Sequence, residues 1–167
     1  MMKKQLFFLL LSLLFIFAGC DTPVNKVTGD YSYKQSGLVT FTDEENNTIS
    51  TLATKQGQMN IMRNAHGEKG DLLITFNEMG GGAYTCTGKI KGDSIFFDPY
   101  EFTTRFSTTD SLSSLLQLGK VYTVQSAGRG IINDDMILVE EQWMGKPEDG
   151  SLIRLHADKI TILAEKN

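Results

Sequence analysis

The chain has 167 residues, 41% of them hydrophobic and 22% charged, with 20 acidic and 16 basic side chains. This length suits a single domain rather than several. A net charge of −4 argues against nucleic acid or an anionic membrane surface as the partner, because both attract basic proteins.

The first 20 residues, MMKKQLFFLLLSLLFIFAGC, differ in composition from everything that follows. Lys3 and Lys4 precede a largely apolar run from Leu6 to Phe17, and small residues come next. A basic start, a short apolar core and a small-residue exit are the three parts of a secretory signal peptide. A membrane-spanning helix needs about 20 apolar residues, so the run is too short to favour a permanent anchor.

The stretch Phe17-Ala18-Gly19-Cys20 also resembles the lipobox of bacterial lipoproteins, although that family usually has Leu or Val where this chain has Phe17. The resemblance implies that residues 1–19 are removed and that Cys20 becomes an acylated, palmitate-bearing N-terminus. It further implies a lipid-anchored protein of a Gram-negative cell envelope, facing the periplasm and held in the outer rather than the inner membrane. The alternative is an ordinary cleaved signal in which Cys20 carries no lipid.

Cleavage before Cys20 changes the bulk properties of the chain. Loss of Lys3 and Lys4 lowers the basic count from 16 to 14 against 20 acidic residues. With Cys20 lipidated, Cys86 has no second thiol, so no intrachain disulfide is expected. We predict a signal peptide at 1–19, a lipidated tether at 20–28 and one β-barrel domain at 29–167.

Apolar residues beyond the signal peptide recur with a period of two. Leu72, Ile74 and Phe76 share one face of an extended segment, and Tyr84 and Cys86 share another. Such alternation is typical of strands with one buried and one solvated face. It predicts strands near 29–42, 48–55, 58–64, 71–78, 83–91, 94–105, 120–133, 136–144 and 151–164. The last of these could also form two shorter strands.

Two further patterns refine this prediction. Met136 to Val139 is apolar at every position, which predicts a strand covered on both faces. Residues 107–119 have leucines at helical spacing and predict a short helix or loop, centred on 108–118.

A weak repeat predicts three hairpins, which pair the following apolar residues across a two-residue turn: Ile90 with Ile95, Ile132 with Ile137, and Leu155 with Ile160. The chain is therefore expected to form consecutive antiparallel hairpins.

The start Gly29-Asp30-Tyr31, a meander of this length and the late basic residue Arg154 resemble the lipocalin and wider calycin families. The resemblance implies an all-β, antiparallel up-and-down meander of about 8–10 strands closed into a barrel, with Arg154 packed on the Tyr31 ring. It also implies a small hydrophobic ligand in the barrel interior. Large side chains expected there are Phe41, Phe76, Tyr84 and Phe97, which either line a cavity or fill it.

No pattern in the chain predicts catalysis. His66 and His156 lack metal-ligand spacing, and Cys86 on an apolar face is expected to be a buried thiol. Adjacent strand residues such as Glu140 and Glu141 point to opposite faces, so they do not form an acid/base pair.

Trp143 is expected to pack in the core or at the rim of the barrel. We therefore expect a non-enzymatic envelope lipoprotein with no cofactor and no metal, which binds a small apolar ligand. The alternative is an envelope component that acts through contacts with proteins or the cell wall.

Overall fold

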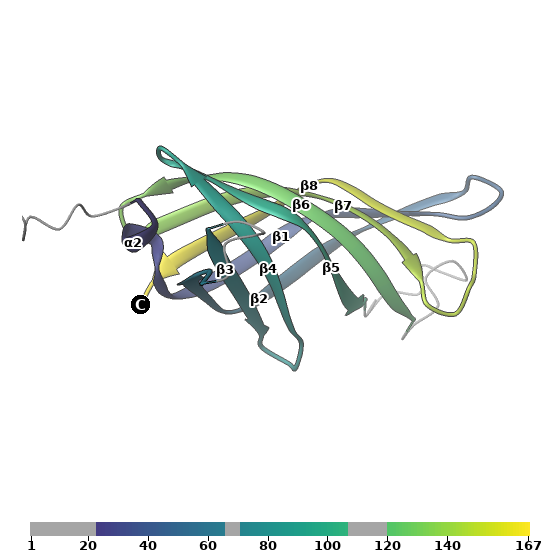
Figure 1. The fold of residues 1–167 in the computed structure, drawn as a ribbon. Coiled ribbons are helices and arrows are strands. Elements are labelled where there is room, and N and C mark those ends of the chain that lie inside the picture. The colour runs from purple at the N-terminus through teal and green to yellow at the C-terminus, as the bar shows by residue number, and fades with distance from the viewer. Residues whose placement is uncertain (1–22, 66–70, 107–119) are drawn as a thin grey trace, which may run out of the picture.

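The structure is a computed structural model that describes residues 23–65, 71–106 and 120–167. Eight strands run up and down in sequence order, and β8 returns to β1 to close a barrel (Figure 1). All neighbouring strands are antiparallel, which confirms the predicted all-β, lipocalin-like meander. The strands are β1 (Gly29–Thr42), β2 (Thr48–Arg63), β3 (Leu72–Glu78), β4 (Ala83–Lys91), β5 (Ser94–Arg105), β6 (Val121–Asn133), β7 (Met136–Pro147) and β8 (Arg154–Lys166).

Apolar residues that recur with a period of two place one face of each strand toward the barrel interior, which gives the barrel a single core. Along β7, for example, Ile137, Val139, Glu141 and Trp143 are buried, whereas the residues that alternate with them are exposed. Each strand contributes such inward side chains, and together they form one continuous hydrophobic cluster. Burial of this apolar surface is the main term that stabilises the fold.

Two of the predicted strand boundaries are wrong. Segments 48–55 and 58–64 form one strand, β2, because Gly57 continues the extended backbone instead of breaking it. A side chain at Gly57 would meet the carbonyl oxygen of Asn77 at 2.0 Å, so glycine is what lets β3 approach β2 here. The last strand is unbroken from Arg154, so Leu155 and Ile160 lie on one strand and do not pair across a hairpin.

The other two predicted hairpins are confirmed. Ile90 pairs with Ile95 across Gly92-Asp93, and Ile132 pairs with Ile137 across Asp134-Asp135. The turns need positive φ, which Gly92 adopts at 62° and Asp134 at 51°.

One end of the barrel, here called the α2 end, is where β1 begins and β8 ends. Helix α2 (Pro23–Val27) lies against it, and Val27 is buried in the core. The Tyr31 hydroxyl donates to the Val27 carbonyl at 3.0 Å, and Lys166 Nζ donates to the Lys26 carbonyl at 3.1 Å. Most of the predicted tether at 20–28 is thus a helix attached to the barrel.

The basic residue expected over the Tyr31 ring is not Arg154. Arg154 opens β8 opposite Thr42, at the far end of the barrel from Tyr31. Lys166 at the end of β8 pairs with Tyr31, and its Nζ lies 5.9 Å from the centre of the Tyr31 ring. The cation–aromatic contact that the resemblance implies is present, but Lys166 makes it.

The prediction that Met136 to Val139 is covered on both faces is wrong. Ile137 and Val139 point into the core, but Met136 and Leu138 are exposed on the outer wall. Antiparallel sheets can leave one face to solvent, so the apolar outer face needs another explanation.

Several predictions concern residues outside the described ranges. These are Cys20 with its signal peptide, the segment 107–119, and His66. Among the described residues, no helix has the length and hydrophobicity to cross a membrane.

Candidate functional site

The barrel wall is paired least completely between β4 and β5. Only the residues from Gly88 to Lys91 pair with β5, although β4 begins at Ala83 and β5 continues to Arg105. The last link is a hydrogen bond from Thr87 Oγ1 to Asp98 Oδ2 at 2.7 Å. Beyond it the two strands separate, and we call this opening the β4–β5 seam.

A groove of about 550 Å³ lies in the seam. It is lined by the turn before β4, by the first residues of β4 and by the facing part of β5: Gly81, Gly82, Ala83, Tyr84, Thr85, Glu101, Phe102 and Thr103. Sites for small molecules usually enclose some 300–1,000 Å³, so the groove is large enough for one small ligand.

Stacked aromatic rings form the inner wall of this groove. The Tyr84 ring lies nearly parallel to the Phe76 ring at 4.8 Å and to the Phe102 ring at 4.9 Å, centre to centre. The Tyr100 ring is also stacked on Tyr84, at 5.8 Å. Tyr84 is only half-buried, so one edge of this stack is open to the groove. Phe76 and Phe102 already cover the faces of the Tyr84 ring, so an apolar group in the groove would meet the open edge of the stack in an edge-to-face contact.

A lysine points into the barrel beside these rings. Lys55 lies on the inward face of β2, and its Nζ is 4.9 Å from the centre of the Phe102 ring and 6.0 Å from that of Tyr84. It forms an ion pair with Glu78, and its side chain is only 12% exposed. The pair places opposite charges beside the aromatic stack without adding net charge.

Deeper in the barrel, Glu141 is 1% exposed and is surrounded by donors. Tyr100 Oη donates to its Oε1 at 2.6 Å, while Trp143 Nε1 and Gln35 Nε2 donate to Oε2 at 3.1 and 3.2 Å. Burial raises the pKa of the Glu141 carboxyl above its ordinary value, and these hydrogen bonds, the one from Tyr100 foremost, oppose the increase.

The backbone around Glu141 is adapted to hold it. Glu141 and Trp143 are two residues apart on β7, so both side chains point inward by the ordinary alternation of a strand, and the extra residue of the nearby bulge lies on β8 between Ala157 and Ile160. On the other side, Gly128 of β6 pairs with Glu141, and a Cβ at Gly128 would lie 2.7 Å from Glu141 Cγ. The absence of a side chain at Gly128 makes room for the carboxylate.

Several buried polar atoms near this cluster have no hydrogen-bond partner among the described residues: the Tyr33 and Tyr84 hydroxyls, Gln35 Oε1 and Ser126 Oγ. The Tyr122 hydroxyl also has none, but Tyr122 packs on Phe41 toward the far end of the barrel. Desolvation raises the pKa of Tyr33 and that of Tyr84 well above the ordinary tyrosine value, so both hydroxyls stay protonated. Most buried polar atoms are hydrogen-bonded, so these unpaired atoms can bind a polar group of a ligand or a water molecule.

The structure places the four predicted interior residues in two groups. Phe76, Tyr84 and Phe97 are near one another, with Phe76 and Phe97 centres 6.0 Å apart. Phe41 lies elsewhere and packs on Phe106 and Tyr122. Phe41, Phe76 and Phe97 are fully buried against other side chains, and only Tyr84 reaches the groove.

Sequence reasoning did not select Lys55, Tyr100 or Glu141. The sequence did contain an indication of their position. Lys55 is an even number of residues from Met59 and Ile61, and Glu141 is two residues from Val139, so each shares the inward face of its strand with apolar residues. A charged residue at an inward position of a strand is the pattern to look for. Cys86 is buried as predicted, and its burial raises its thiol pKa, which lowers its reactivity.

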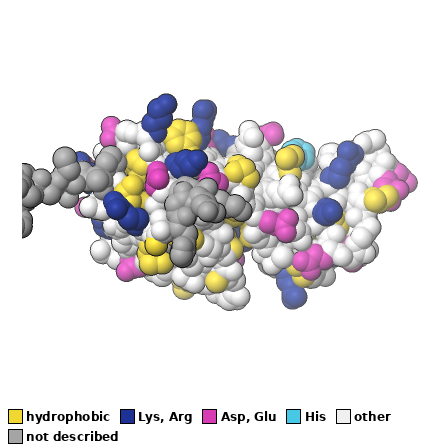
Figure 2. Space-filling view, viewed as in Figure 1, with side chains coloured by type: hydrophobic (Ala, Val, Ile, Leu, Met, Phe, Trp, Pro, Cys, Tyr) yellow, Lys and Arg dark blue, Asp and Glu magenta, His cyan; other side chains and the backbone are white. Residues whose placement is uncertain are grey.

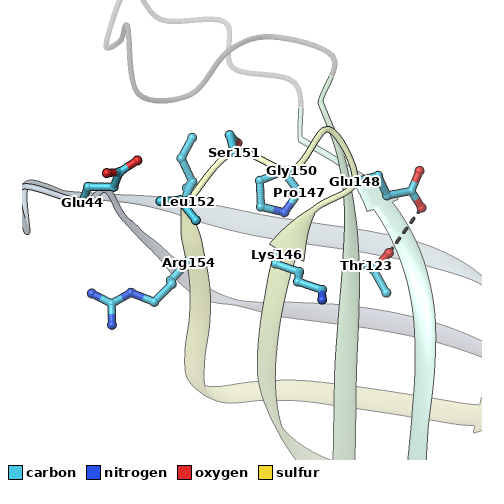
Figure 3. A pocket seen from close by; sticks show the side chains of 10 residues that line it. Glu44, Thr123, Lys146, Pro147, Glu148, Gly150, Ser151, Leu152 and Arg154 are labelled. Atoms are coloured by element: carbon cyan, nitrogen blue, oxygen red, sulfur yellow. Dashed lines mark hydrogen bonds between the residues drawn. The ribbon is translucent and has the colours of Figure 1, made fainter.

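A second groove, of about 720 Å³, lies at the far end of the barrel and is shown in Figure 3. The β7–β8 connection forms one side, where Thr123 Oγ1 donates to Glu148 Oε1 at 3.3 Å. Charged side chains of both signs line it, namely Glu44, Lys146, Glu148 and Arg154 (Figure 3). It lacks the stacked rings of the seam, so we favour the seam as the ligand site.

Comparison with protein-family models, with curated proteins and with solved structures finds no match to this chain. The described residues contain no cluster of three or more His, Cys, Asp or Glu side chains that could hold a metal ion. The site is therefore interpreted from its own geometry.

Proposed function

We propose that this protein is a non-catalytic bacterial envelope lipoprotein, anchored through lipid on Cys20, whose barrel binds a small, largely apolar ligand in the β4–β5 seam. The observation that carries the ligand site is the open edge of the Tyr84–Phe102 stack in a groove of about 550 Å³. Anchoring rests on the lipobox-like end of the signal peptide.

The seam also indicates what kind of ligand fits. The open ring edge favours an apolar body, and the exposed Thr85, Glu101 and Thr103 side chains that line the groove can bind one polar group. The core beneath is filled by side chains such as Phe76 and Phe97. The ligand is therefore expected to lie in the wall of the barrel instead of along its axis.

Ligand binding is tested first by native mass spectrometry of the protein purified from its own host. A reproducible non-covalent adduct is the expected result. The adduct should disappear in Ala83→Arg and Thr103→Arg, which place a long side chain in the groove without disturbing the core. Gln142→Arg, at an exposed position on β7 outside both grooves, is the matched control.

A titration with the apolar fluorophore N-phenyl-1-naphthylamine gives a second measurement on the same variants. We expect the groove variants to weaken its binding at least about tenfold, equivalent to roughly 1.4 kcal/mol, and the control variant to bind normally. Equal binding by all of them, with no native adduct, would exclude the seam as the site.

The anchor is tested separately by Cys20→Ala. The variant should lose metabolic lipid label and leave the membrane fraction. If it stays membrane-bound and labelled, Cys20 is not the lipidated residue.

One observation favours a second function, contact through the outer surface. Ile131, Leu138 and Leu163 are all exposed on the outside of the barrel. Side chains of this kind gathered on one wall are typical of a surface that meets a partner.

A further inference from the structure

The exposed apolar residues at the α2 end form one continuous patch. Ile131 on β6 pairs with Leu138 on β7, and Leu138 pairs with Leu163 on β8, so the three lie side by side across the wall. Met136 and Phe96 extend the group along neighbouring positions. We call Phe96, Ile131, Met136, Leu138 and Leu163 the wall patch.

Basic residues surround the wall patch, although the chain as a whole is acidic. The row of Ile131, Leu138 and Leu163 ends at Lys34 on one side and, through Ser94, at Lys91 on the other. The adjacent row places Lys89 and Arg129 on either side of Phe96. Figure 2 shows hydrophobic side chains among basic (dark blue) and acidic (magenta) ones toward the α2 end of the barrel.

These basic groups are available for a partner. Lys34, Lys89, Lys91 and Arg129 are exposed, and none of the four forms an ion pair with another described residue. Of the nearby acids, Glu140 is already paired with Lys159, whereas Glu165 and the hairpin-turn residues Asp93, Asp134 and Asp135 form no ion pair with another described residue. The rim of the wall patch is therefore basic on its β1, β4 and β6 sides, and its acidic residues lie at the hairpin turns and the end of β8.

The chain outside the described residues leads to the same end of the barrel. Helix α2 begins at Pro23, only three residues after Cys20. Three residues span at most about 11 Å, so lipid on Cys20 would hold the α2 end at the bilayer surface. Met136 opens β7 and Leu163 lies three residues before the end of β8, which puts the wall patch within roughly 10 Å of that end.

We propose that the wall patch rests on the bilayer that holds the Cys20 lipid, with its apolar side chains at the boundary between headgroups and acyl chains and its basic rim against anionic lipid phosphates. An apolar centre with flanking Lys and Arg is the composition of interfacial membrane-binding surfaces. This inference rests on the proposed anchor and adds an orientation, with the barrel lying on its β6–β8 wall.

A second copy of this chain is a less suitable occupant of the same surface. In a symmetric dimer the patch would meet itself, so the basic rims of the two copies would be brought together and repel each other. A bilayer containing anionic lipid complements both the apolar centre and the rim.

The test uses the lipidated protein in vesicles of phosphatidylethanolamine and phosphatidylglycerol that contain a nitroxide-labelled phospholipid. A bimane fluorophore is attached to Leu138→Cys in the wall patch or to Leu52→Cys, an exposed apolar position on the outer face of β2, as the matched control. The unsubstituted protein, whose Cys86 is buried, controls for labelling elsewhere.

We expect nitroxide quenching at position 138 to exceed that at position 52 by at least about twofold, because interfacial side chains penetrate roughly 5–10 Å. Combined Lys89→Glu, Lys91→Glu and Arg129→Glu substitutions should abolish this difference while the protein still floats with the vesicles. Reversal of Lys146 and Arg154, at the far end of the barrel, should leave it unchanged.

Three results would overturn the proposal, and each points to a different fault. If the protein floats with the vesicles but both positions are equally quenched, the anchor stands and the orientation is wrong. If position 138 escapes quenching but cross-links to a second copy, the wall patch is a dimer interface. If the protein does not float, the Cys20 anchor fails, and the orientation fails with it.

Discussion

At the scale of single residues, a carboxyl group in the middle of an apolar barrel needs explanation. Glu141 is stabilised there because Tyr100, Trp143 and Gln35 all donate hydrogen bonds to it. A buried carboxyl group with this many donors lowers the stability of the fold little while every hydrogen-bond partner is present. Removal of either the carboxyl group or a donor lowers stability much more, because the remaining polar atoms are left buried without a partner. The hydrogen bond that Tyr100 donates to Glu141 also fixes the orientation of the Tyr100 ring, which is stacked on Tyr84 at the seam.

Substitution of Glu141 tests this dependence. Glu141→Leu should lower the free energy of unfolding by about 3–5 kcal/mol, because three buried donors lose their acceptor. Tyr100→Phe removes a single hydrogen bond to the carboxylate and should cost only about 1.5–3 kcal/mol.

Urea denaturation measures both variants and the double variant. The double variant should lose less stability than the sum of the two single losses, because Phe at position 100 leaves no orphaned hydroxyl. Strict additivity would show that Tyr100 and Glu141 do not act as a unit.

The raised pKa of Glu141 makes stability depend on pH. Its folded pKa lies above the ordinary value of 4.5, so the folded state binds the proton more tightly than the unfolded state. The contribution to stability is therefore complete below pH 4.5 and is lost as the pH rises through the folded pKa.

The measurement is the difference in unfolding free energy between the native protein and Glu141→Gln, taken from urea titrations at a series of pH values. This difference should shift against the native protein as the pH rises. If the difference instead shifts in favour of the native protein as the pH rises, the hydrogen bonds lower the pKa of Glu141 by more than burial raises it.

At the scale of elements, β6 and β7 are shaped to each other around Glu141. Gly128 lies where a Cβ would meet Glu141 Cγ at 2.7 Å and Val139 Cγ1 at 3.0 Å. These strands are paired along their whole length, so neither can move aside without loss of backbone hydrogen bonds. The β4–β5 seam is different, since only four residues of β4 pair with β5 and the rest of the wall there is open.

Gly128→Val should therefore destabilise the protein by about 1–3 kcal/mol through overpacking. Ala127→Val, next along β6 but on the exposed outer face, is the matched control and should leave stability within about 0.5 kcal/mol. Thermal and urea unfolding of the two variants decide the point. Equal stability would show that the Glu141 side chain moves aside readily.

At the scale of the whole molecule, one continuous core joins all eight strands, and helix α2 contributes Val27 to it. A barrel without independent parts is expected to unfold in a single cooperative step. The distribution of charge also belongs to this scale, because closure of the barrel gathers basic residues from β1, β4 and β6 around the wall patch.

Trp143, the single tryptophan, reports on that cooperativity because it is buried beside Glu141. Its fluorescence and the far-ultraviolet circular dichroism should change at the same urea concentration. Separate midpoints would show that the seam side of the barrel opens before the β7 side.

The strand pattern and most boundaries were predictable from the sequence because burial alternates strictly in a barrel with one core. The same alternation predicted that Phe76 and Tyr84 point inward and that Cys86 is buried. It failed at Gly57 and at residues 155–160, where glycine and a bulge continue a strand that local composition suggests will break. Pairing with a neighbouring strand keeps the chain extended at these places, and a local sequence pattern carries no information about that neighbour.

The period of two, the acidic total charge and the signal-like N-terminus are properties of the sequence alone, since each depends only on local composition. Only the tertiary structure decided that Lys55, Tyr84 and Phe102 meet at a seam, that Glu141 finds three donors, and that Lys166 instead of Arg154 covers Tyr31. It also decided that an acidic chain presents a basic-rimmed apolar wall. The physical reason is register, because contacts between strands far apart in sequence depend on how each hairpin aligns its neighbours.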